Sequence, residues 1–137
     1  MINMDKILDL AIEKDASDIH LIVENKPILR IRRELVPIEE MDVLTVDDMN
    51  DMYDYLVRGN IDKDEVFNST RKLDTSYEYK NVRLRVNISL SNDIPLCTLR
   101  IIKSVLPPYE TLGLPDIIRR ETYQPQGLIL VTGKTNS

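Results

Sequence analysis

The clearest pattern in the chain is an alternation of apolar and polar residues in its middle third. Apart from Thr75, apolar or aromatic residues take every second position within residues 72–79, 82–90 and 96–102, which is the two-residue period of strands with one buried face. The dipeptides Lys80-Asn81 and Asn92-Asp93 suit two-residue hairpin turns, because Asn and Asp tolerate positive φ. The pattern therefore predicts a three-stranded antiparallel meander.

The requirement for one apolar face also fixes how these strands pair. A slip by one residue would move every side chain of a strand to the opposite face. With two-residue turns, Val86 lies opposite Leu99 and the apolar positions share one face. A three-residue second loop would place Val86 opposite Thr98 and mix the two faces, so the two-residue turn is favoured.

The polar face of this meander concentrates arginines. In the expected register Arg85 lies opposite Arg100, and Arg83 lies opposite Glu78 as in a surface ion pair. Like charges opposed across strands are destabilising, and guanidinium groups match the geometry of phosphate. We therefore hypothesise that Arg83, Arg85 and Arg100 form an anion site for phosphate. The alternative is that the arginines extend into water or pair with Asp74 and Glu78.

Before the meander, the pattern predicts helices and shorter strands. Apolar residues at helical spacing indicate helices over about residues 5–12 and 45–58, with a further short helix at 62–68. A period of two predicts strands at 19–23 and over 28–37. Together with the meander, these elements predict an α/β (α+β) domain in which helices flank an antiparallel sheet.

The C-terminal part of the chain has a different organisation. Pro107-Pro108 and Gly113 indicate a stiff connector, and Pro115 can begin a short helix. The apolar run from Gly127 to Val131 is typical of a strand buried on both faces of a parallel sheet. We expect three regions: a compact domain at residues 1–103, a connector at 104–125, and the first strand of another domain at 126–137.

Gly133 follows the apolar run and begins a small polar tail. A strand that leads into G-x-x-x-x-G-K-[ST] is typical of a phosphate-binding P-loop. Gly133 fits the first glycine, and the four variable positions are matched by Lys134, Thr135, Asn136 and Ser137. Gly133-Lys134-Thr135 also reads as the end of the motif, but the first glycine would then fall at Leu128. The tail matches the beginning of a P-loop; the alternative is an ordinary strand followed by a flexible tail.

Composition narrows the classes of function. The hydrophobic fraction of 42% and the charged fraction of 30% are those of a globular chain, and no apolar run approaches a membrane span. The single cysteine, Cys97, cannot form an internal disulfide and suits a reducing compartment. One histidine, His20, argues against a zinc site, and the net charge of −5 argues weakly against binding to nucleic acid.

Five short motifs then occur in a recognisable order. They are Ala16–Leu21 (Ala-Ser-Asp-Ile-His-Leu), Pro27–Ile31, Leu84–Asn87, Leu112–Pro115 and Gly127–Gly133. Together they resemble the N-terminal part of the type II/IV secretion ATPases (the PulE/VirB11-like family), and within that family the motors that retract type IV pili. The resemblance covers nearly the whole chain.

The resemblance implies a PAS-like N-terminal domain joined by a linker to a RecA-like ATPase domain. It implies a cytoplasmic homohexamer at the inner face of the cell membrane, where an inner-membrane pilus platform protein is its partner. ATP with Mg²⁺ would lie between the two domains, and Arg83, Arg85 and Arg100 match the family's phosphate-contacting arginines. The intact protein would be an ATPase that drives twitching motility.

The resemblance also implies limits on this chain. The P-loop lysine and the Walker B acid are not among its 137 residues, so we expect an N-terminal fragment that is inactive alone and binds no cofactor by itself. Two alternatives stay open: a free-standing PAS-like sensor or adaptor, and the N-terminal domain of a pilus-assembly or type II secretion ATPase.

Arg33 and Lys134 differ from the family's pattern, and His20 matches it. The family commonly has Gly near Arg33, so we expect the hairpin at Arg32-Arg33-Glu34 to be rebuilt, and Lys134 stands where the family commonly has Pro. His20 matches the family's Ser-Asp-x-His-Leu segment, and we interpret it as a strand residue with a structural hydrogen bond rather than a catalytic base.

Overall fold

The structure is a computed structural model that describes residues 1–134. It divides the chain into two units, Met1–Ser104 and Val105–Ser137. The elements of the first unit are α1 (Met4–Glu13), β1 (Asp18–Leu21), β2 (Ile28–Ile31), β3 (Glu34–Pro37), α2 (Val46–Val57), α3 (Ile61–Thr70), β4 (Lys72–Tyr79), β5 (Val82–Ser91) and β6 (Ile94–Ile102). The second unit contains a 3₁₀ turn, η1 (Tyr109–Leu112), and α4 (Asp116–Glu121).

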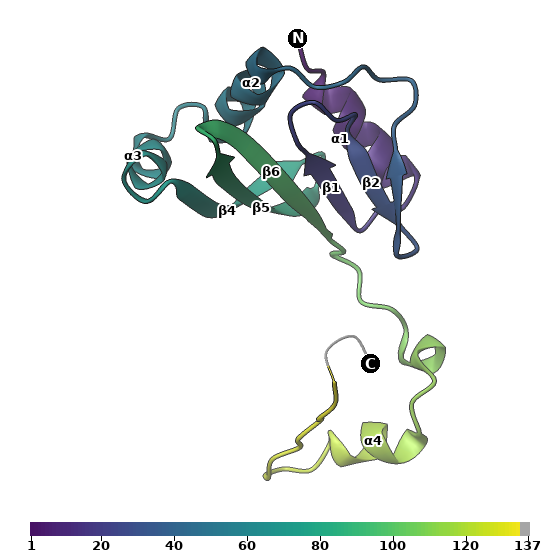
Figure 1. Cartoon of the computed structure of the whole chain (residues 1–137). Coiled ribbons are helices and arrows are strands. Elements are labelled where there is room, and N and C mark those ends of the chain that lie inside the picture. Colours follow the sequence, from purple (N-terminus) through teal and green to yellow (C-terminus); the bar gives the residue numbers. More distant parts are fainter. Residues whose placement is uncertain (135–137) are drawn as a thin grey trace. The chain divides into compact units, whose positions relative to one another are not determined.

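The strands of the first unit form one antiparallel sheet in the order β3-β2-β1-β6-β5-β4 (Figure 1). The predicted meander is confirmed as β4-β5-β6, with Val86 opposite Leu99. Both of its turns have two residues at positive φ: 45° and 66° at Lys80-Asn81, 50° and 63° at Asn92-Asp93. The prediction of an α/β fold with an antiparallel sheet and flanking helices is therefore correct.

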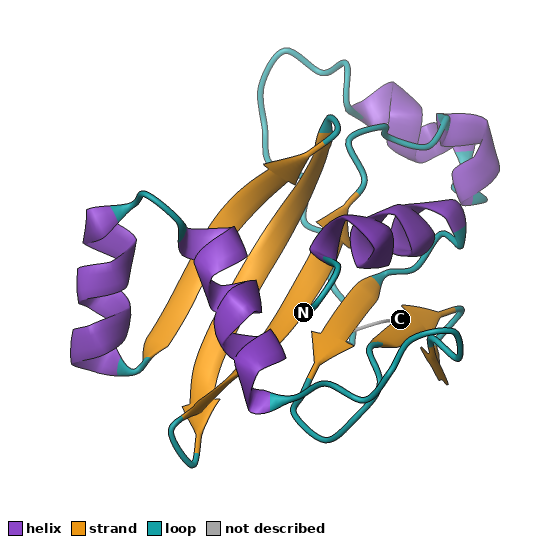
Figure 2. Ribbon diagram, turned by 90° about the horizontal axis from the view of Figure 1, so that it is seen from above, coloured by secondary structure: helices purple, strands orange, loops and turns teal. Residues whose placement is uncertain are grey.

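Helices cover one face of this sheet, and their caps match the sequence pattern. Helices α1 and α2 lie over the sheet in the view from above (Figure 2). The side chain of Asn3 accepts a hydrogen bond from the backbone N–H of Lys6 at the start of α1. At the start of α2, Thr45 and Asp48 form a reciprocal capping box.

The core lies between these helices and the sheet. Apolar side chains from α1, α2 and every strand except β3 are buried there, among them Ile7, Leu8, Ile19, Leu21, Leu29, Met49, Met52, Leu73, Leu84, Val86, Ile88 and Leu99. The side chains on alternate strand positions point to the opposite face, and that face is polar in β4 and β5. The fold therefore offers one polar sheet surface on the first unit.

The hairpin between β2 and β3 turns without glycine. Arg32 and Arg33 have φ values of 49° and 72°, the left-handed region that favours glycine. Ile31 lies opposite Glu34 in the ladder, so the turn has two residues. The backbone therefore adopts a turn suited to glycine, at a cost in strain carried by two arginines.

The expected C-terminal strand is not assigned in the second unit. We expected a strand from Gly127 to Val131, but residues 127–134 have no helix or strand in this structure. Leu128 and Val131 are exposed by 81% and 88%. A strand of a buried parallel sheet takes its hydrogen bonds from neighbours on both sides, and none of the described residues provides them. Within residues 1–134, no helix is long and apolar enough to cross a membrane.

We predict that Arg33→Gly stabilises the first unit. Glycine removes the steric cost of positive φ but adds freedom to the unfolded chain, so we expect a net gain of about 0.5–1 kcal/mol in the free energy of unfolding. Urea unfolding followed by circular dichroism measures it. Arg58→Gly is the control, because Arg58 has a φ of −43° and the same change should lower stability there. A loss of stability in Arg33→Gly would contradict the prediction.

Candidate anion-binding site

A row of side chains crosses all six strands on the polar face of the sheet. Successive strand pairs place these residues opposite one another in the order Leu35, Arg30, Asp18, Arg100, Arg85 and Ser76. Arg85 and Arg100 are directly opposed, as the sequence predicted. Asp18 stands between Arg30 and Arg100, because β1 pairs with both β2 and β6.

Asp18 is the most buried charge of this row. Its side chain is 9% exposed. Arg100 Nε donates a hydrogen bond to Oδ1 at 3.0 Å, and Ser17 Oγ donates one to Oδ2 at 2.9 Å. Arg30 Nε lies 3.6 Å from Oδ2 on the other side. Burial acts to raise the pKa of Asp18, but the hydrogen bonds from Arg100 and Ser17 and the charge of Arg100 outweigh it and hold that pKa below its ordinary value.

Arg85 pairs with an exposed carboxylate, that of Asp74. Its Nε and Nη2 donate to the two carboxylate oxygens of Asp74 at 3.2 and 2.8 Å, a bidentate pair in which both side chains are largely exposed. The hydrogen bond from Arg85 lowers the pKa of Asp74. The structure thus adopts the alternative in which Arg85 meets Asp74, whereas Arg100 meets Asp18 rather than Glu78.

Arg83 completes the set of arginines. It lies opposite Glu78 and Ile102 as the register required, but among residues 1–134 no carboxylate oxygen comes within 4.0 Å of its guanidinium nitrogens. The expected Arg83–Glu78 ion pair is therefore not formed, which is consistent with the small gain from such pairs in water.

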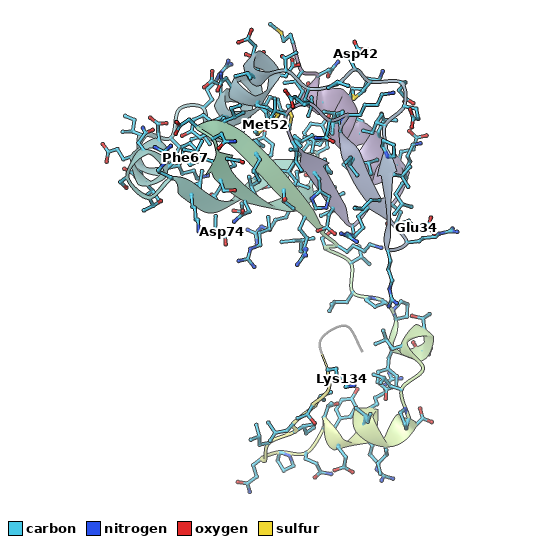
Figure 3. All side chains as sticks on the ribbon, in the orientation of Figure 1. Glu34, Asp42, Met52, Phe67, Asp74 and Lys134 are labelled. Carbon is cyan, nitrogen blue, oxygen red and sulfur yellow. The ribbon has the colours of Figure 1, made fainter. Side chains whose placement is uncertain are left out.

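The arginine set leaves hydrogen-bond donors unused. Among the described residues, Arg100 uses its Nε alone and Arg85 uses one edge of its guanidinium. Figure 3 shows the labelled Asp74 on the sheet face away from α1 and α2. Arg83, Arg85 and Arg100 are all exposed on that same face. Their free N–H groups can therefore meet an anion that approaches this face.

The remaining predicted nucleotide contacts come from the C-terminal part of the sequence. Gly133, which was predicted to contact nucleotide, belongs to the second unit, where it is exposed and outside regular structure, as is its neighbour Lys134. Thr135, Asn136 and Ser137, also predicted to contact nucleotide, lie outside the described residues. His20 lies in β1, where its Nδ1 is 3.4 Å from Thr98 Oγ1, and its Nε2 is buried without a hydrogen-bond partner among the described residues.

Sequence reasoning missed Asp18, Ser17 and Arg30. Asp18 alternates with the buried Ile19, so its place on the polar face could have been read from the pattern. What the pattern could not give is that β1, a strand of four residues, pairs with β6 some eighty positions later. That pairing is what brings Asp18 to Arg100.

Comparisons with known proteins identify relatives of the chain. No protein-family model matches the chain. The type IV pilus retraction ATPase PilT of Pseudomonas aeruginosa is 32% identical over 98% of this chain and 39% of its own length. A twitching motility protein of Neisseria gonorrhoeae is 34% identical over 53% of this chain and 20% of its own length.

Solved structures share the fold. The crystal structure of the pilus retraction motor PilT with bound ADP matches with a TM-score of 0.85 and 29% identity, over 100% of this chain and 40% of that chain. The ATPase DotB of Legionella pneumophila matches with a TM-score of 0.72 and 25% identity, over 90% of this chain and 35% of that chain.

The antiparallel sheet with helices on one face thus has the fold of an N-terminal domain of ATPases such as PilT and DotB. More particularly, the chain is homologous to the N-terminal part of the pilus retraction motor PilT, which confirms the resemblance carried by the five motifs. The chain spans about two fifths of the length of the curated relatives that it matches over nearly its whole length.

We predict that Asp18→Asn shows a pH-dependent loss of stability. The pKa of Asp18 lies below its unfolded value of about 3.9, so the ionised carboxylate stabilises the fold above that pH, and its contribution is lost as the pH falls through the folded pKa. At pH 7 we expect a loss of about 1.5–3 kcal/mol in the free energy of unfolding. Urea unfolding at several pH values measures it.

The difference between wild type and Asp18→Asn should shrink as the pH falls from about 5 to 2. Asp74→Asn is the matched control, because it removes the same charge from an exposed pair and should change stability much less. A difference for Asp18→Asn that stays constant down to acid pH would contradict the ionic role of Asp18.

Proposed function

We propose that this chain is the N-terminal domain of a hexameric ATPase motor that drives type IV pilus retraction, with Arg83, Arg85 and Arg100 contacting the phosphates of ATP. The observation that carries the proposal is the gathering of three exposed guanidinium groups on one sheet face of a domain homologous to the PilT motor. The cytoplasmic setting, the homohexamer and a pilus platform protein at the inner membrane as partner belong to the same proposal.

The residues present fit one side of a nucleotide site. Arg83 has its whole guanidinium available among the described residues, and Arg100 keeps its two terminal nitrogens. Arginine donors of this kind match phosphate oxygens in pairs. Asp18 and Asp74 compete for Arg100 and Arg85, so a phosphate must either use the free nitrogens or draw these side chains away.

The other side of the site would come from the ATPase domain. When bound, ATP with Mg²⁺ would supply the phosphoryl group whose transfer to water drives the motor. Gly133 and the positions after it match the start of a P-loop, whose backbone N–H groups would face the phosphates. The three arginines would then place positive charge against the phosphates from the N-terminal domain.

Residues 104–125, which connect the two domains, would let phosphate binding change the orientation of the N-terminal domain. The division of the chain falls between Ser104 and Val105, and the following stretch contains Pro107-Pro108 and no regular element before Tyr109. Binding of phosphate by the arginines would favour one orientation of the N-terminal domain, and release would favour another. A hinge within residues 104–125 would absorb the rotation between them.

A second candidate is a secretion-type ATPase motor that does not retract pili. The fold shared with DotB, at 25% identity, favours it. The arginines would have the same role there, and only the machine attached to the motor would differ.

A chimera tests the proposal. Residues 1–126 of this chain would replace the matching part of P. aeruginosa PilT, and ATP hydrolysis and twitching would be measured in a pilT-deficient strain. Arg83→Ala, Arg85→Ala and Arg100→Ala should each lower kcat/KM, by up to about a hundredfold where the contact acts in the transition state. Restored hydrolysis without restored twitching would favour the second candidate.

Arg58→Ala is the matched control. It removes the same charge from the end of α2, outside the arginine set, and should leave hydrolysis unchanged. If the three arginine variants hydrolyse ATP as fast as Arg58→Ala, the phosphate role of this face is wrong.

A further inference from the structure

Two arginines share one buried carboxylate at the centre of the row. Asp18 Oδ1 accepts a hydrogen bond from Arg100 Nε at 3.0 Å, and Arg30 Nε stands 3.6 Å from Oδ2. The first contact is a hydrogen bond and the second an ion pair without one. The side chain of Asp18 is 9% exposed, whereas those of Arg30 and Arg100 are 39% and 70% exposed. The carboxylate is therefore fixed, and the arginines are the parts that can move.

The charges of this group do not balance. Arg30 and Arg100 carry two positive charges against the single negative charge of Asp18, whereas Arg85 and Asp74 form a balanced pair of their own. An anion near Arg100 would complete the balance. Arg100 is thus better placed than Arg85 to turn toward a phosphate, because its departure leaves another cation beside the carboxylate.

The departure of Arg100 would be costly if Asp18 had no other partner. A buried carboxylate that loses its only counter-charge is strongly destabilising. Arg30 already lies on the opposite side of the carboxylate, and Oδ2 can accept from it in addition to Ser17, because each carboxylate oxygen has two lone pairs. A small side-chain movement would turn the ion pair with Arg30 into a hydrogen bond.

We propose that the carboxylate of Asp18 changes its hydrogen-bond partner when phosphate binds. In the absence of phosphate it accepts a hydrogen bond from Arg100, and when Arg100 turns to the phosphate it accepts one from Arg30 instead. We call this change of partner the exchange. The inference rests on the proposed function, because it assumes that Arg100 contacts phosphate. Asp18 and Arg30 are positioning residues in this exchange, and neither touches the phosphate.

The exchange would also reach the hairpin between β2 and β3. Arg30 Nη1 lies 3.4 Å from the backbone oxygen of Arg33, to which it donates a long hydrogen bond. Movement of Arg30 toward Asp18 would weaken that bond at the turn where Arg33 has a positive φ. Phosphate bound on β6 would thereby alter contacts two strands away.

A double-mutant cycle on the 137-residue chain tests the exchange. The probe is inorganic tripolyphosphate at low salt, and binding is followed through the arginine Nε–H signals in NMR spectra. Arg30→Ala should weaken binding about tenfold in the wild-type background, a coupling typical of charges in one network. In the Asp18→Asn background the same change should matter little, because no buried charge remains to be satisfied.

Arg32→Ala supplies the matched control for the loss of positive charge. Arg32 lies in the same hairpin but makes no ion pair with Asp18 within the described residues. Its effect on binding should be small and equal in both backgrounds. Should Asp18→Asn unfold, Asp18→Thr, which suits a strand, serves the same comparison.

The outcomes separate the exchange from the proposed function. If Arg100→Ala weakens binding but Arg30→Ala acts equally in both backgrounds, the exchange is wrong and the phosphate role of Arg100 stands. If Arg100→Ala binds tripolyphosphate like wild type, or wild type shows no saturable binding, the phosphate role of Arg100 fails and the exchange fails with it.

Discussion

The pairing of β1 with β6 is the constraint on which the rest of this structure depends. It joins the hairpin β2-β3 to the meander β4-β5-β6 and so makes one six-stranded sheet. On the covered face it sets Ile19 opposite Leu99, two side chains that are fully buried. On the polar face the same register sets Asp18 opposite Arg100. Because side chains alternate along a strand, a slip by one residue would lose the core contact and the ion pair together.

The polar face shows how a sheet can tolerate opposed like charges. Arg85 and Arg100 face each other across β5 and β6, and each turns to a carboxylate on its far side: Asp74 in β4 and Asp18 in β1. The two carboxylates differ in exposure, so the ion pairs of the two arginines differ in strength. Arg85 belongs to a solvated pair of small energetic value, whereas Arg100 leans on a charge that the fold has largely removed from water.

Much of the fold could be predicted from local sequence signals, whereas the candidate site depends on strands that are far apart in the sequence. Alternation and the Lys80-Asn81 turn were enough to place Arg85 opposite Arg100, because a hairpin closes over few residues. The partner of Arg100 could not be predicted in the same way, since β1 is short and far away in the sequence. The run after Gly127 had the composition of a strand but no neighbour to pair with among the described residues. Arg83 and Glu78 are opposite each other in register, but both are exposed and they form no ion pair among the described residues, because exposed pairs gain little in water.

The row across the sheet also sets a length scale. Adjacent strands lie about 4.8 Å apart, so the backbones of Arg30 and Arg100, with β1 between them, are separated by about 10 Å. One carboxylate can serve both because each guanidinium stands at the end of a long, flexible stem that spans half of that gap. A lysine would bring its charge as a single point without the Nε donor that Arg100 uses. A substitution in this row therefore changes the length of the side chain and the geometry of its donors as well as its charge, and all three affect the contact with Asp18.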